Sequence, residues 1–121
     1  MLKYDFDDIR NVIERSSARE TAMRVALGSV CRKLLETFNI YVGSYVTSIL
    51  TATDTKDYSN LFTPQQINIK ADKSPVRAMN SEVEKEMIDI ISNAKDKGDS
   101  VGGSFNTVSY THLTLPTKRI V

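Results

Sequence analysis

The 121-residue chain has few of the residues that build common chemical sites, with one cysteine, one histidine and no tryptophan. The single cysteine, Cys31, excludes an intrachain disulfide. The formal net charge is only +1, which argues against a nucleic-acid binder that works through bulk charge. No apolar run approaches the roughly 18 residues that a membrane span needs. The first residues lack the apolar core of a secretory signal, so we expect a cytoplasmic protein.

What is present is typical of a folded domain. Hydrophobic residues make up 40% and charged residues 26% of the chain, which argues against a disordered acidic tail. There is no internal repeat and no low-complexity tract. The length suffices for about one small domain with a modest core.

The clearest expected element is a helix over residues 17–38. Ser17 and Glu20 have the S-x-x-E spacing of a capping box, in which the serine hydroxyl accepts from the N–H of the glutamate. Apolar residues then recur at helical spacing, namely Ala22, Val25, Ala26, Val30, Leu34 and Phe38. Asn39 follows as a helix stop.

Three segments are expected to be strands. Residues 40–50 are rich in β-branched and aromatic side chains, which favours a strand. The polar residues 51–57 predict a loop after it. Residues 66–71 predict a short strand, and residues 101–105 the start of another.

A second helix is expected over residues 81–97. Ser81 and Glu84 repeat the S-x-x-E spacing, apolar residues follow at helical spacing, and Gly98 stands where a C-terminal cap belongs. The expected order is therefore helix, strand, helix, strand. One such unit cannot easily bury both faces of a sheet, so the pattern predicts a slice of a larger α+β domain.

One short segment has the chemistry of an anion site. Residues 15–19 read Arg-Ser-Ser-Ala-Arg and place two guanidinium groups and two hydroxyls at a helix N-terminus. Free backbone N–H groups and the positive end of the helix dipole meet there, which suits phosphate. The neighbouring basic residues are instead expected to form a solvated face with carboxylate partners, namely Arg10, Arg24, Arg32 and Lys33.

Residues 10–22, Arg-Asn-Val-Ile-Glu-Arg-Ser-Ser-Ala-Arg-Glu-Thr-Ala, resemble chorismate synthase, and the R-S-S-A-R-E-T core is highly specific to that family. The match continues in V-G-S-Y-V at 42–46, K-S-P-V-R at 73–77 and G-D-S-V-G-G at 98–103. The resemblance covers residues 2–105 approximately, in the order and spacing of the family. It implies an internal fragment of a mixed α/β sandwich that assembles as a homotetramer.

The resemblance also implies an activity. Chorismate synthase is a carbon–oxygen lyase of the shikimate pathway of aromatic amino acid biosynthesis. It converts 5-enolpyruvylshikimate 3-phosphate to chorismate and phosphate by a 1,4-elimination that needs reduced FMN. In such a flavoprotein the cofactor carries the hard chemistry, and the protein supplies binding, orientation and electrostatics. Whether the parent enzyme reduces its own flavin with NADPH stays open.

The resemblance also implies roles for residues that match the family's motif by position. Arg15, Ser16 and Ser17 match the family's flavin-contacting segment, and Arg19 matches an arginine near the substrate anion. Two interpretations of Ser17 stay open, a pure helix cap or a direct ligand contact. The family's catalytic histidines lie in segments that have no match here, so we expect no catalytic residue, no metal site and no activity of the fragment alone. The alternative is a small anion- or nucleic-acid-binding module built on the arginine-rich helix start, although the helix lacks interleaved aromatic residues.

The last part of the chain has a different origin. Residues 108–117, V-S-Y-T-H-L-T-L-P-T, resemble the in-frame translation of a transposase-type sequencing adapter. We therefore expect residues 1–107 to be a partial chorismate synthase domain and residues 108–121 to be a non-native tail. The only histidine, His112, lies in this tail and receives no catalytic role.

Three further residues have expected structural roles. Arg77 is predicted to form a structural salt bridge, and Gly102 and Gly103 to serve a turn or close packing. Leu50 stands where members of the family often carry glycine.

Overall fold

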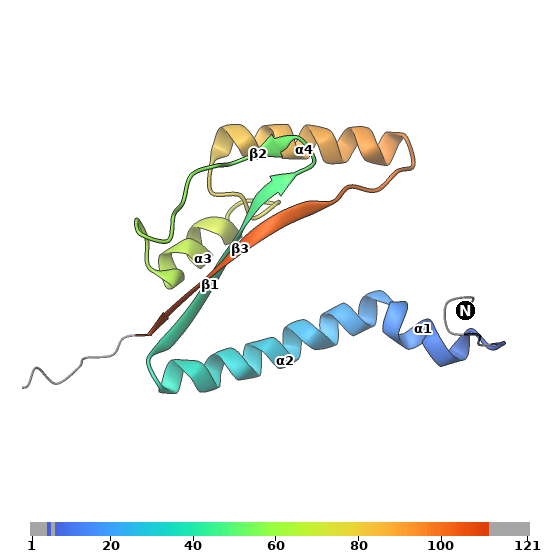
Figure 1. Ribbon diagram of the computed structural model, residues 1–121, viewed down its shortest axis with the longest axis horizontal. Coiled ribbons are helices and arrows are strands. Elements are labelled where there is room, and N and C mark those ends of the chain that lie inside the picture. Colours follow the sequence, from blue (N-terminus) through green and yellow to red (C-terminus); the bar gives the residue numbers. More distant parts are fainter. Residues whose placement is uncertain (1–4, 6, 112–121) are drawn as a thin grey trace, which may run out of the picture. The chain divides into compact units, whose positions relative to one another are not determined.

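The computed structural model describes residue 5 and residues 7–111, drawn as a coloured ribbon in Figure 1. The chain divides into two compact units, the first ending at Phe38 and the second beginning at Asn39. The two units contain four helices and one antiparallel sheet in the described residues, so the α+β class predicted from the sequence is confirmed. Within the described residues, no helix is both long and apolar enough to cross a membrane.

The first unit consists of two helices, α1 (Arg10–Ser16) and α2 (Ala18–Thr37). Helix α2 confirms the helix predicted over residues 17–38, with Ser17 as its N-cap and Phe38 as its C-cap. Asn39, with φ of 57°, is the predicted stop. The prediction missed α1, because seven residues give only about two turns of apolar periodicity.

The second unit is built on a three-stranded antiparallel sheet. It contains β1 (Ile40–Ile49), β2 (Ala52–Thr53) and β3 (Gly103–Thr111) in the order β2-β1-β3. Strands β1 and β3 run side by side along nearly their whole length, as Figure 1 shows. The strand predicted over 40–50 is confirmed, and the strand predicted from 101 begins at 103. The segment predicted as a loop contains the short β2.

Helices α3 (Pro64–Asp72) and α4 (Ser81–Asp96) pack against this sheet. Their contacts divide the core into two clusters. One consists of Tyr45, Tyr58, Ile67 and Ala71, and the other of Ala52, Ala78 and Met87. Tyr45 and Tyr58 meet edge to face, with ring centroids 5.4 Å apart.

The strand predicted over residues 66–71 is wrong, because this segment lies inside α3. Thr63 is the N-cap, its hydroxyl accepts from the N–H of Gln66, and the Gln66 side chain accepts from the N–H of Thr63. Pro64 occupies the first turn, where a missing N–H costs nothing. Ile67 and Ala71, four residues apart on one face, are fully buried. The capping box and the proline were the sequence signals that identify this helix.

Helix α4 confirms the helix predicted over 81–97 but begins differently. Its N-cap is Asn80, which accepts from the N–H of Glu82 at 2.9 Å, so the capping box predicted at Ser81 is wrong. Asparagine is about as good an N-cap as serine, so Asn80 can cap the helix one residue before Ser81. Gly98 ends the helix with φ of 67°, as predicted.

Two glycines allow backbones to approach closely. A Cβ at Gly103 would lie 2.4 Å from the carbonyl oxygen of Ser48, which confirms the predicted close packing there. A Cβ at Gly43 would lie 2.6 Å from the carbonyl oxygen of Pro64, so this glycine lets the start of α3 rest on β1. A Cβ at Gly102 would meet nothing within 4 Å.

Candidate functional site

The predicted anion-binding residues gather at the junction between α1 and α2. Arg15 lies in the last turn of α1, Ser16 ends that helix, and Arg19 lies in the first turn of α2. Between the helices, Ser17 adopts an extended conformation with φ of −85° and ψ of 158°. This one residue interrupts the helical backbone and so creates the free N-terminus of α2 in the middle of the R-S-S-A-R segment.

Ser17 caps α2, as predicted, but with a different donor. Its hydroxyl oxygen accepts from the N–H of Arg19 at 3.2 Å rather than from the N–H of Glu20. The carboxylate of Glu20 pairs with Arg24 at 3.3 Å. The expected reciprocal capping box is therefore replaced by a simple cap and an ion pair four residues apart.

The hydroxyl of Ser16 is directed back along α1. It donates to the carbonyl oxygen of Val12 at 2.9 Å, and the carbonyl oxygen of Ile13 lies 3.3 Å away. In this conformation the Ser16 hydroxyl is bonded to the backbone of α1. Its side chain therefore points back along the helix, and only the backbone of Ser16 lies at the junction.

The basic residues of the first unit fall into two classes. Four have carboxylate partners, as predicted: Arg10 with Asp8, Arg24 with Glu20, and Arg32 and Lys33 with Glu36. The Arg10 guanidinium holds the pKa of Asp8 below its usual value, mainly through their side-chain hydrogen bond. Within the part of the chain that the structure describes, Arg15 and Arg19 have no ion-pair partner, and both are exposed. Their positive charge remains available to an anion.

The donor set at this junction fits a phosphate group. It consists of two guanidinium groups at the N-terminus of a 20-residue helix, whose dipole favours an anion at this end. The N–H groups of Arg19 and Glu20 are already bonded to the hydroxyl and the carbonyl oxygen of Ser17. Glu20 is the only acidic residue in the first turn, and it is engaged by Arg24. A planar guanidinium can bind two phosphate oxygens at once, which an ammonium group cannot.

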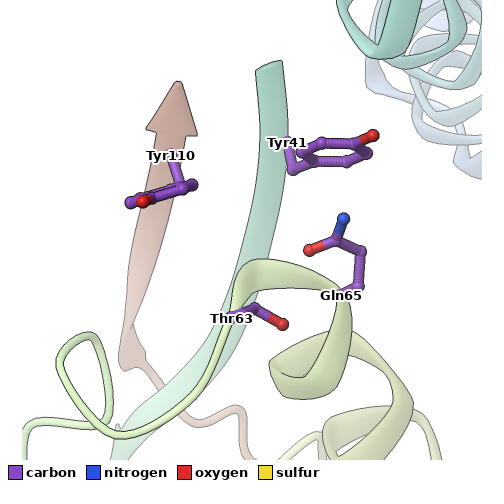
Figure 2. A pocket seen from close by; sticks show the side chains of 4 residues that line it. All are labelled: Tyr41, Thr63, Gln65 and Tyr110. Atoms are coloured by element: carbon purple, nitrogen blue, oxygen red, sulfur yellow. The ribbon is translucent and has the colours of Figure 1, made fainter. Parts of the chain in front are cut away.

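The second unit has a recess of about 290 Å³ that lacks such chemistry. Figure 2 shows its lining: Tyr41 on β1, Tyr110 on β3, and Thr63 and Gln65 at the start of α3. None of these side chains is charged, and Tyr110 belongs to the segment predicted to be non-native. We therefore place no functional site there.

Other reactive groups are sparse. Among the described residues, no group of three His, Cys, Asp or Glu side chains could hold a metal ion. His112 lies outside the described residues. The α1–α2 junction is thus the part of the described structure with the clearest ligand chemistry.

Comparison with known proteins gives one consistent answer. The sequence model of the chorismate synthase family matches residues 1–114. The chorismate synthase of Alkaliphilus metalliredigens is 51% identical over 104 residues, which are 86% of this chain and 26% of that protein. Chorismate synthase 1 of Bacillus anthracis is 44% identical over 108 residues, 89% of this chain and 27% of that protein. A crystal structure of chorismate synthase matches with a TM-score of 0.71 and 41% identity, covering 89% of this chain and 34% of that one. The chain spans about a quarter of the length of these curated relatives.

Proposed function

Because the chain belongs to the chorismate synthase family, we propose that it is part of an enzyme that converts 5-enolpyruvylshikimate 3-phosphate to chorismate and phosphate. The proposed reaction is a 1,4-elimination in aromatic amino acid biosynthesis, and it requires reduced FMN. The observation that carries the proposal is the family match over residues 1–114, which includes the R-S-S-A-R segment at the start of α2.

The α1–α2 junction is the proposed anion-binding part of the active site. Arg15, Ser16 and Ser17 would hold the flavin, and Arg19 would hold the substrate anion. Both ligands carry phosphate, and the exposed, unpaired guanidinium groups of Arg15 and Arg19 support this assignment within the described residues. Bound reduced FMN would supply the electron-transfer chemistry of the elimination. This chain's own residues would bind and orient anions, through the charge of the guanidinium groups and the positive end of the α2 dipole.

The chain alone is proposed to be inactive. It spans about a quarter of its curated relatives, and the family's catalytic histidines are expected in segments outside it. The parent enzyme is proposed to be a cytoplasmic homotetramer, with no nucleic-acid or membrane partner.

Residues 108–121 are proposed to be a non-native tail because of their resemblance to translated adapter sequence. The family match runs to residue 114, and β3 pairs Val108 with Gly43 and Thr111 with Ile40. The β-forming Val, Tyr and Thr of this segment favour such pairing whatever their origin. A long sequencing read of the source DNA across the codon for Thr107 tests the proposal. Continuation into family sequence supports it, and a native gene that encodes the tail overturns it.

Activity is tested with two proteins, the 121-residue chain and the full-length product of the source gene. Each is given reduced FMN and 5-enolpyruvylshikimate 3-phosphate without oxygen, and chorismate is measured. We expect turnover by the full-length protein and none by the chain. A full-length protein that makes no chorismate would overturn the proposed function. Salt-dependent binding of arbitrary oligonucleotides would instead favour the nucleic-acid-binding alternative.

A further inference from the structure

The central strand β1 has two edges with different cover. Strand β3 pairs with it from Ile40 to Ile49, whereas β2 pairs only with Ser48 and Ile49 on the other edge. The central part of that second edge, from Val42 to Val46, lies beside α3 and the turn that follows it. We call this part the outer edge of β1. An uncovered strand edge presents free N–H and C=O groups that pair readily with another strand.

The first cover of the outer edge is the side chain of Asn68. Its amide nitrogen donates to the carbonyl oxygen of Val42 at 2.9 Å, and its amide oxygen accepts from the N–H of Ser44 at 3.2 Å. One donor and one acceptor directed at residues two apart is what a residue of a parallel neighbouring strand provides. Asn68 is only 8% exposed, and its amide oxygen also accepts from the Arg77 guanidinium at 3.5 Å, so this buried amide is held in place from two sides.

The second cover is Arg77, which uses both its side chain and its backbone. Its guanidinium donates to the carbonyl oxygen of Ser44 at 3.0 Å, and its own carbonyl oxygen accepts from the N–H of Val46 at 2.9 Å. Ala78 then forms a parallel bridge with Val46. Four successive backbone groups of the outer edge, from the Val42 C=O to the Val46 N–H, are therefore all hydrogen-bonded.

The K-S-P-V-R segment holds Arg77 in the conformation that this dual contact needs. Arg77 has φ of 56°, a left-handed conformation that costs free energy for any residue but glycine. The buried Ser74 hydroxyl accepts from the N–H groups of Val76 and Ala78 and so fixes the turn on both sides of Arg77. Asp72 forms an ion pair with the guanidinium, which confirms the predicted salt bridge.

We propose that Asn68 and Arg77 form a surrogate strand that closes the outer edge of β1 against pairing with the same edge of a second copy of this chain. The K-S-P-V-R segment then serves an assembly role separate from the anion site at the α1–α2 junction. In the described sheet, β3 has β1 as its only strand neighbour, whereas the outer edge of β1 is closed by these two residues.

The local part of the proposal is tested by amide hydrogen exchange, followed by NMR in the 121-residue chain. Asn68→Ala should lower the protection of the Ser44 amide by about fivefold to tenfold, the effect of one lost hydrogen bond, and leave Val46 protected. Arg77→Gly keeps the carbonyl group and suits the positive φ, so Val46 should stay protected. Asn93→Ala is the matched control, since Asn93 is an exposed residue of α4 whose side chain forms no hydrogen bond to the described part of β1, and both amides should stay protected. Fast exchange of Ser44 and Val46 in the unmodified chain would overturn the proposal.

The assembly part is tested with the double variant Asn68→Ala with Arg77→Gly. Sedimentation velocity over a range of concentrations should show stronger self-association than the unmodified chain or Asn93→Ala. The Ser44 amide should regain protection as the concentration rises, because a second copy now pairs there. A double variant with an unprotected Ser44 amide that associates no more than the control would overturn the proposal. Should the double variant lose its far-UV circular dichroism, each single variant is put to the same sedimentation test.

Discussion

Replacing Gly43 with alanine should destabilise the second unit more than any other single-methyl addition to a described glycine outside β3. The new Cβ would lie 2.6 Å from the Pro64 carbonyl oxygen and 2.9 Å from its Cα. Ordinary contact begins at 3.4 Å, so the first contact is short by about 0.8 Å, the difference between the two distances. Both atoms belong to the backbone of α3, so no side chain can rotate away, and the helix itself must move off β1.

The magnitude follows from two effects. Overpacking of this kind costs about 1–3 kcal/mol. A shift of α3 would also stretch the two hydrogen bonds from Asn68 to β1, which measure 2.9 and 3.2 Å and lie on both sides of Gly43. Loss of one of them would add roughly 1 kcal/mol. We expect a loss of about 2–4 kcal/mol in the free energy of unfolding, or a fall in Tm of roughly 10–25 °C for a unit of this size.

The assay is urea and thermal unfolding of the 121-residue chain, followed by far-UV circular dichroism. Gly102→Ala is the control, because a Cβ there meets nothing within 4 Å and the φ is not positive. That variant should change the free energy of unfolding by less than about 1 kcal/mol. If Gly43→Ala were as stable as Gly102→Ala, the close contact between α3 and β1 would be refuted.

Three other perturbations have defined outcomes. In the full-length product of the source gene, Arg19→Lys should weaken binding of inorganic phosphate by about tenfold, while Arg32→Ala, which removes a guanidinium paired with Glu36 near the other end of α2, should leave it unchanged in isothermal calorimetry. Leu50→Gly should raise the free energy of unfolding by roughly 0.5–1 kcal/mol in urea, because Leu50 has φ of 49° and an exposed side chain in the two-residue turn between β1 and β2. Burial and the hydrogen bond to Asp54 raise the pKa of Tyr58 from 10.0 to about 12. The protonated phenol therefore stabilises the fold below pH 10, and this contribution is lost as the pH rises toward 12, so the pH-dependent fall in Tm over that range should be smaller in Tyr58→Phe.

The long elements could be predicted from the sequence because their periodicity extends over several turns. Helix α2, helix α4 and strand β1 were all predicted close to their observed bounds. Helix α3 was not, because Ile67-Asn68-Ile69 alternates like a strand, whereas the N-cap Thr63 and Pro64 precede the segment predicted as a strand. Ile69 is in fact exposed, and Asn68 is buried.

The anion site and the surrogate strand also differ in how far the sequence predicts them. The residues of the anion site are five consecutive positions, so the sequence alone places them together at a helix start. The surrogate strand brings Asn68 and Arg77 to backbone groups of β1 that lie 24 to 33 positions earlier in the chain. No local sequence pattern predicts contacts between residues so far apart in the chain. The one local part is the ion pair of Arg77 with Asp72, five residues away. A salt bridge of Arg77 was predicted without its partner, and the structure confirms it.

The order of these groups along the chain has a consequence for synthesis on the ribosome. At about 5–20 residues per second, the 31 residues from Val46 to Arg77 take roughly 2–6 seconds to translate. During that interval β1 has emerged while the residues that cover its outer edge have not. Strand β3 is translated later still, so α3 and its turn are the first partners available to β1. A nascent chain that stalls after β1 has emerged but before α3 has emerged would therefore expose both edges of its central strand to neighbouring chains on the same polysome.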